Sequence, residues 1–71
     1  MAKDVRKWMR AELESNLSDY LDSANVLNAT KLAEAADCEL FPNNYGDIDE
    51  SLFETSAEVV EQVTRERGLN R

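Results

Sequence analysis

"LNATKLAEAADCELFPNNYGDIDES", residues 27–51, is the stretch that decides the fold. Asn28 is a good helix N-cap, and small and apolar side chains follow it at helical spacing. Pro42 disfavours helical geometry in the residue before it, so the helix predicted over residues 29–40 ends there. Cys38 points away from the predicted packing face of this helix, which consists of Ala29, Leu32, Ala33, Ala36 and Leu40. Such a narrow face of small residues predicts close approach to another helix.

Residues 41–49 follow as a loop. Asn43, Asn44 and Gly46 tolerate left-handed backbone angles, which is typical of an ordered turn. We expect Phe41 and Tyr45 to pack beneath this loop.

A third helix is predicted to begin between residues 47 and 51. Either Asp47 with Glu50, or Ser51 with Glu54, forms a capping-box pattern there. Gly68 is a good C-terminal stop. The predicted inner face consists of Leu52, Phe53, Ser56, Ala57, Val59, Val60 and Val63.

Upstream of the quoted stretch, one long helix is predicted over residues 3–23. Its core face spans an arc of about 160° and consists of Ala2, Val5, Met9, Leu13, Leu17, Tyr20, Leu21 and Ala24. Trp8 lies off this face, on the side that carries Glu12, Ser15 and Asp19. A tryptophan in such surroundings is a candidate interface anchor. Alternatively, helix curvature or the third helix covers it.

The predicted fold is therefore all-α: a small three-helix domain over residues 1–71 with an ordered loop between helices two and three. A chain of this size rarely gains more than about 3–5 kcal/mol from a single core, so it often relies on a partner. A homodimer that completes the first helix's face is one such arrangement.

Charge is distributed unevenly along the chain, whose net charge is −7. Residues 1–11 carry +3, residues 12–61 carry thirteen acids against Lys31 alone, which gives −12, and residues 62–71 carry +2. A strongly negative middle repels nucleic acid and attracts basic protein surfaces. The acids also favour solubility, and that simpler interpretation stays open.

Cysteine usage and the absence of long apolar runs bear on the compartment. Cys38 is the only cysteine, so the chain cannot form an internal disulfide, which suits a reducing compartment. No apolar run approaches the length of a membrane span, and no apolar segment follows the charged N-terminus as in a signal peptide. We therefore expect a cytoplasmic protein with no membrane partner.

Catalysis is not expected from this composition. The chain has no histidine, the commonest general base at neutral pH and the commonest metal ligand. Asp37 and Glu39 flank Cys38, and their negative charges disfavour the reactive thiolate. We predict no catalytic residue, no cofactor and no specific ion site. The oxygen-rich stretch NNYGDIDE does not match the calcium-loop pattern.

The stretch NATKLAEAADCEL resembles the first helix of a helix-turn-helix unit, which often carries T-x-L-A-x-x-A before a short turn. That resemblance would imply a second helix with basic or amide side chains for base edges. Instead, no base occurs between Lys31 and Arg65. A small transcriptional regulator, with the basic chain ends on DNA, is thus the alternative. The bases around Trp8 could equally pair with acids elsewhere in the fold.

The acids of the third helix form the leading candidate site. Glu50, Glu54, Glu58 and Glu61 lie at i, i+4, i+8 and i+11, opposite the predicted core face. This acidic ridge has the charge to bind a row of Lys and Arg on a nucleic-acid-binding protein, as a nucleic-acid mimic would. Supporting residues are Asp47, Asp49, Tyr45 and Trp8. Reversing Glu54, Glu58 and Glu61 to Lys should abolish binding without unfolding the domain.

In length, acidity and predicted architecture the chain resembles the small acidic helical proteins with which phages and mobile elements block host defence or host polymerases. Anti-CRISPR proteins are the best-known group. These families share no common signature, so the resemblance transfers no residue. It implies a protein-binding inhibitor or modulator that docks an acidic surface on a basic, nucleic-acid-binding partner, with no direct nucleic-acid binding.

Overall fold

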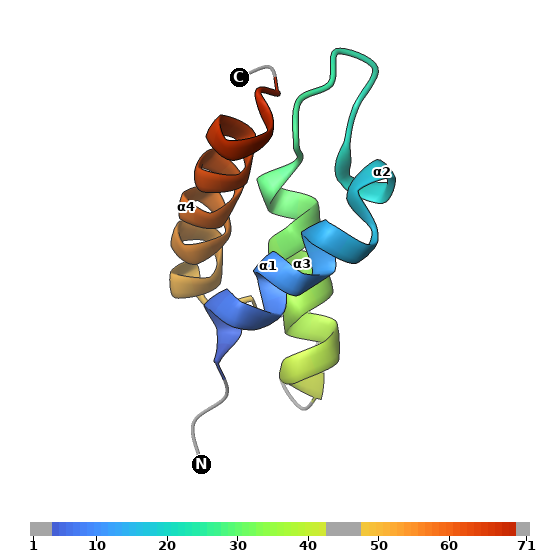
Figure 1. Cartoon of the computed structure of the whole chain (residues 1–71). Helices are drawn as coiled ribbons and strands as arrows, with labels where there is room; N and C mark the ends of the chain where they lie inside the picture. Colours follow the sequence, from blue (N-terminus) through green and yellow to red (C-terminus); the bar gives the residue numbers. More distant parts are fainter. Residues whose placement is uncertain (1–3, 43–47, 70–71) are drawn as a thin grey trace.

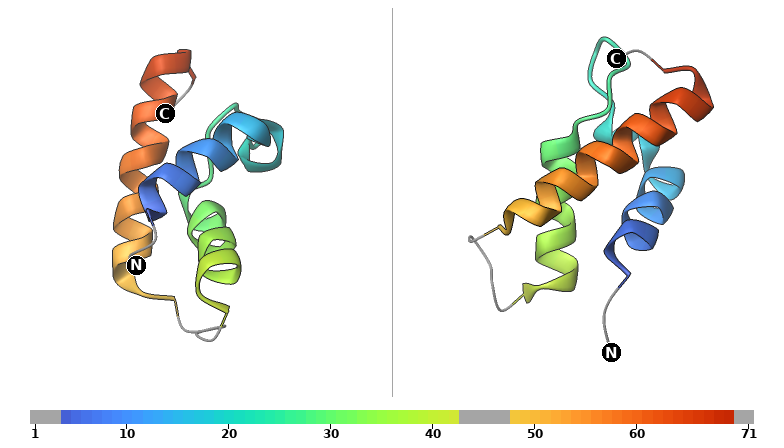
Figure 2. Two further views of the ribbon diagram at one scale, coloured as in Figure 1. Left: turned by 60° about the horizontal axis from the view of Figure 1, so that its bottom comes forward. Right: turned by 90° about the vertical axis from the view of Figure 1, so that its left-hand side faces the viewer.

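The computed structural model describes residues 4–42 and 48–69. These residues form four helices, which are α1 (Val5–Ser15), α2 (Leu17–Tyr20), α3 (Ala29–Leu40) and α4 (Glu50–Arg67). Among the described residues the only β pairing is one isolated antiparallel bridge, between Leu21 and Leu27. α4 packs obliquely across α3, and α1 packs against both of them (Figure 1; Figure 2). The all-α class is confirmed.

The predicted long first helix is wrong: it is interrupted at Asn16. Asn16 has non-helical angles (φ −132°, ψ 40°), and its backbone N–H ends α1 by donating to the Glu12 carbonyl at 2.9 Å. Asn side chains offer the backbone alternatives to helical bonds, and here the Asn16 amide also bonds the Glu12 carboxylate. The apolar spacing continues through Leu17, Tyr20 and Leu21, which is why the break is invisible to periodicity.

Residues 21–28 form a tight turn rather than the end of a helix. The Asp22 carboxylate accepts from the N–H groups of Ala24 (2.8 Å) and Val26 (3.0 Å), and Asn25 adopts a left-handed angle (φ 61°). The Asn28 N–H donates to the Tyr20 carbonyl at 2.8 Å. This turn brings Leu27 into the core.

α3 has the predicted bounds. The Asn28 side chain accepts from the Lys31 N–H at 3.0 Å, and the helix ends at Leu40, with Phe41 as C-cap and Pro42 next. Cys38 is exposed, as expected. However, Asp37, which falls on the outward side of the sequence pattern, is buried with only 4% exposure. Of the 41–49 loop, residues 43–47 lie outside the described residues, so the predicted packing of Tyr45 does too.

α4 begins one residue after Asp49, which is the N-cap and accepts from the Ser51 N–H at 3.0 Å. Ser51 is therefore a helical residue and not a cap. The predicted stop at Gly68 is confirmed: it is left-handed (φ 67°), and the Leu69 N–H bonds the Thr64 carbonyl at 2.9 Å. Leu69 packs back against the core.

Side chains from all four helices and from the turn form the core. Its buried apolar members are Met9, Leu13, Tyr20, Leu27, Leu32, Ala33, Ala36, Leu52, Val59 and Val63. Three predicted core residues are exposed instead: Ala24 in the turn, and Phe53 and Ala57 on α4. Trp8 is half-buried and packs against the core cluster, so the off-face assignment from the helical pattern is only partly correct.

Candidate protein-binding surface on helix α4

The four glutamates of the acidic ridge all lie on the solvent side of α4. Glu50, Glu54, Glu58 and Glu61 are exposed, whereas Leu52, Ser56, Val59 and Val63 on the opposite side are buried. The Ser56 hydroxyl is satisfied within the helix, because it donates to the Phe53 carbonyl at 2.9 Å. Asp49 is exposed beside the ridge, while Asp47 and Tyr45 lie outside the described residues.

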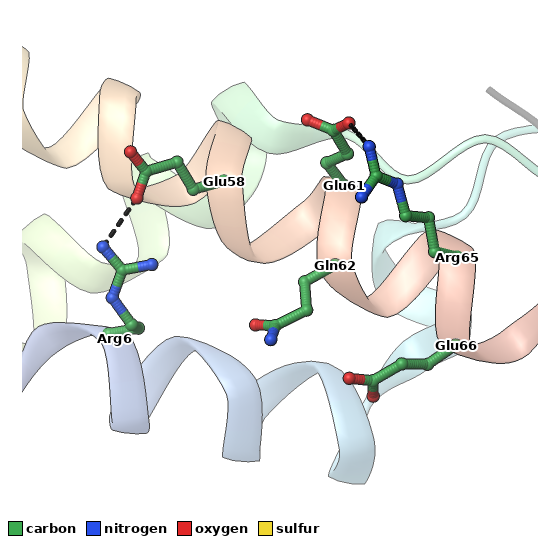
Figure 3. Close-up of a pocket in the computed structure, with 6 residues that line it drawn as sticks. All are labelled: Arg6, Glu58, Glu61, Gln62, Arg65 and Glu66. Atoms are coloured by element: carbon green, nitrogen blue, oxygen red, sulfur yellow. Dashed lines mark hydrogen bonds and ion pairs between the residues drawn. The ribbon is translucent and has the colours of Figure 1, made fainter.

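Two ridge glutamates are paired with arginines of the same chain. Arg6 of α1 donates to the Glu58 carboxylate at 2.6 Å, and Arg65 of α4 donates to the Glu61 carboxylate at 2.7 Å (Figure 3). Both pairs are solvent-exposed, and such pairs contribute only about 0.2–1 kcal/mol. A partner that offers well-placed bases can therefore replace these arginines at small cost.

The paired residues line an open groove of about 500 Å³ between α1 and α4. Gln62 points into it between the Arg6 and Arg65 sides (Figure 3). At the groove's far end Glu66 pairs with Arg10, which also lies 3.6 Å from Glu14. The lining mixes both signs of charge, so the groove itself is no uniform acidic track.

Two bases of the N-terminal segment pair with acids elsewhere in the fold. Arg6 pairs with Glu58 and Arg10 pairs with Glu66, both on α4. Lys7 is exposed and forms no ion pair within the described residues. Lys3 lies outside them.

The beginning of α4 carries glutamates that no arginine of the described residues neutralises. Within the part of the chain that the structure describes, Glu50 and Glu54 form no ion pair. Phe53 lies between them in sequence and is 38% exposed, the only exposed large hydrophobic side chain among the described residues. We define Glu50, Phe53 and Glu54 as the α4 start patch. Aromatic side chains, phenylalanine included, are enriched in protein interfaces, which makes this patch a candidate binding surface.

The helical pattern misplaced Phe53, although a signal was present. Leu52 and Phe53 are neighbours, so only one can face the core fully. Leu52 is in register with Ser56, Val59 and Val63 at i+4, i+7 and i+11, all of which are buried, and Phe53 is one step out of that register.

Lys31, the single base within residues 12–61, is held on the other side of the molecule. Its ammonium donates to the Asp19 carbonyl at 2.6 Å and lies 5.9 Å from the centre of the Tyr20 ring. Burial raises the pKa of Tyr20 above its ordinary value of 10.0, and the charges of Glu12 and Asp19 and a hydrogen bond with Glu12 raise it further.

Two further findings concern metal and membrane. Within residues 4–42 and 48–69, no three His, Cys, Asp or Glu side chains come together to hold a metal ion. None of the helices that the structure describes is both long and apolar enough to cross a lipid bilayer.

No protein-family model matches the chain, and comparisons with curated proteins and with solved structures likewise found no match. The function is therefore inferred from the residues and their geometry.

Proposed function

We propose that this chain is a non-enzymatic protein-binding domain that docks its acidic surface on a basic, nucleic-acid-binding partner. The observation that carries the proposal is the α4 start patch, where Phe53 is exposed between two glutamates that form no ion pair in the described residues. Aromatic anchors ringed by charge give interfaces both their affinity and their register.

The ridge continues the patch as a line of carboxylates. Glu50, Glu54 and Glu58 follow one another at a rise of about 6 Å along the helix axis. Such a line suits a partner's row of Lys and Arg, the row that otherwise binds phosphates. Occupying it would inhibit the partner in the manner of a nucleic-acid mimic, as the resemblance to anti-CRISPR-like phage inhibitors implies.

The test compares two charge-matched double variants. Glu50→Gln/Glu54→Gln removes two unpaired ridge charges, and Glu34→Gln/Glu39→Gln removes two exposed charges of α3 that form no ion pair in the described residues. Each tagged protein captures partners from a prokaryotic lysate at low and high salt. We expect the α4 variant to lose a nucleic-acid-binding protein that the wild type and the α3 variant retain at low salt, and added DNA or RNA to displace that protein. Equal retention by both variants, or no capture at all, would overturn the proposal.

A homodimer is the second candidate, and the exposed Phe53 favours it too. Sedimentation equilibrium distinguishes the homodimer from the protein-binding domain. A homodimer would have a mass of about twice 8.1 kDa. If Phe53→Ala halves that mass, the second copy binds at the α4 start patch. A transcriptional regulator finds less support, because Arg6 and Arg10 are paired with acids. A salt-sensitive gel shift that requires Arg6, Lys7 and Arg10 would favour it.

A further inference from the structure

A cavity of about 140 Å³ lies among residues from the start of α1, the end of α3 and the start of α4. We call it the Asp37 cavity, because Asp37 lines it and is only 4% exposed. The Asp37 carboxylate accepts no hydrogen bond and forms no ion pair with any described residue. No buried side-chain oxygen of the described residues lacks a partner, so solvent reaches the Asp37 carboxylate oxygens. Because Asp37 lines the cavity, a ligand that enters the cavity can reach this carboxylate.

The walls of the Asp37 cavity divide into two kinds. Val5, Phe41 and Leu52 supply apolar surface. Besides Asp37, the polar side consists of the Asp49 carboxylate and the residues Ser51 and Thr55. A ligand that combines an aliphatic stem with a positively charged end would match both walls, as the lysine side chain does.

The size of the cavity agrees with a single side chain. A volume of about 140 Å³ holds roughly four to five water-sized groups. Lysine fits this size, because it carries four methylenes and one ammonium. Drug-sized ligands occupy sites of about 300–1,000 Å³, so a nucleotide or a similar cofactor is too large.

The sign of the charge also selects a cation. The N-terminus of α4 contributes a partial positive charge of about half a unit, which by itself would favour an anion. Asp49 already caps that terminus, since it accepts the Ser51 N–H. Asp37 and Asp49 together bring two full negative charges to the cavity, which outweigh the helix end.

From the unpartnered Asp37 and these walls, we infer that the cavity receives one lysine side chain of the basic partner. This inference rests on the proposed function and deepens it. The ridge attracts the basic surface, and the cavity fixes its register by accepting one ammonium at Asp37. The ridge and the cavity together therefore recognise the position of one lysine as well as the overall charge of the partner.

The test uses a blocked Gly-Lys-Gly peptide as the probe, with the Nε-acetylated peptide and the Gly-Arg-Gly peptide beside it. Methyl NMR resonances of Val5, Leu52 and Thr55 report on the cavity walls. We expect the lysine peptide to shift these methyls saturably and the other two peptides to bind more weakly. Asp37→Asn should weaken lysine-peptide binding about tenfold, the usual effect of removing a charged hydrogen-bond partner. Glu39→Gln, the charge-matched exposed control on the same helix, should bind like the wild type.

Stability provides an independent readout. Asn has nearly the shape of Asp and no charge to desolvate, so the urea midpoint of Asp37→Asn should equal or exceed that of the wild type. A clear fall in the midpoint, reproduced by Lys3→Met, would show that the chain's own lysine satisfies Asp37 and would overturn the inference. Equal binding of the acetylated peptide, tighter binding of the arginine peptide, or unchanged binding by Asp37→Asn would also overturn it.

The two proposals can fail separately. If the ridge variant Glu50→Gln/Glu54→Gln loses the captured partner while Asp37→Asn retains it fully, the ridge is the binding site and the cavity is not. If no partner is captured but the lysine peptide binds in an Asp37-dependent way, the cavity stands and the proposed function fails.

Discussion

Arg6 of α1 and Glu58 of α4 are joined by a 2.6 Å ion pair although 52 positions separate them in the sequence. The pair connects the first and last helices across the open groove and neutralises one charge of the acidic ridge. The protein thus carries some of its own counter-charges where a basic partner would bind.

Arg6→Ala should expose the Glu58 charge and raise affinity for a basic partner. The stability cost should stay below about 1 kcal/mol, because the pair is solvent-exposed. Lys7→Ala is the matched control, since it removes the same charge one residue away without breaking an ion pair of the described residues. Calorimetric titration with polylysine measures the affinity, and urea unfolding measures the stability. Equal gains in both variants would mean that net charge alone sets the affinity.

Leu52→Ala and Phe53→Ala should separate the folding side of α4 from its binding side. Leu52 is 4% exposed, and truncating a buried leucine costs about 2–5 kcal/mol. Phe53 is 38% exposed, so its removal should leave stability within about 1 kcal/mol while weakening partner capture. Urea unfolding of both variants decides this. A large loss of stability from Phe53→Ala would show that Phe53 contributes to the core and would contradict its assignment to the binding surface.

Stability should fall at high pH because of Tyr20. The folded-state pKa of Tyr20 lies above its ordinary value of 10.0, mainly through burial. The protonated phenol therefore contributes stability that is complete below the unfolded-state pKa and is lost as the pH rises through the folded-state pKa. Urea unfolding on both sides of pH 10.0 should show this loss in the wild type but not in Tyr20→Phe, which cannot ionise. Parallel curves for the two proteins would contradict the assignment.

Gly68→Ala should destabilise the protein through the backbone alone. Gly68 has a φ of 67°, and an added Cβ would meet no atom within 4 Å. The expected cost is about 1–2 kcal/mol, the penalty of a left-handed residue with a side chain. Gly68→Asn should lose less, because asparagine tolerates this conformation better. Thermal unfolding measures both, and an alanine variant as stable as the wild type would show that the left-handed turn is dispensable.

Features with a local cause could be predicted from the sequence. α3 begins at the Asn28 cap and ends before Pro42, and α4 ends at Gly68, because each signal acts through its own neighbouring residues. The spacing of apolar residues also predicted the buried faces of the helices, wherever the helix is uninterrupted. Glu50, Glu54, Glu58 and Glu61 were placed on the exposed side of α4 for the same reason.

Features with a non-local cause could not be predicted. The long first helix gives way to a turn whose bonds join Asn28 to Tyr20 and Leu21 to Leu27. The burial of Asp37 depends on how α1 and α4 pack on α3, which no periodicity encodes. Likewise, the pairing of Arg6 with Glu58 and of Arg10 with Glu66 depends on the crossing of α1 and α4. Within the candidate site, the sequence pattern predicted which glutamates are exposed, but it did not predict which of them form ion pairs.

The contact between α1 and α4 also means that the core depends on residues far apart in the sequence. Met9 and Leu13 of α1 belong to the same buried cluster as Val59 and Val63 of α4. A chain cut before Val59 would leave the apolar faces of α1 and α3 without the helix that covers them. Such a truncated chain should therefore lose the packing of α1 and α3 as well as α4 itself.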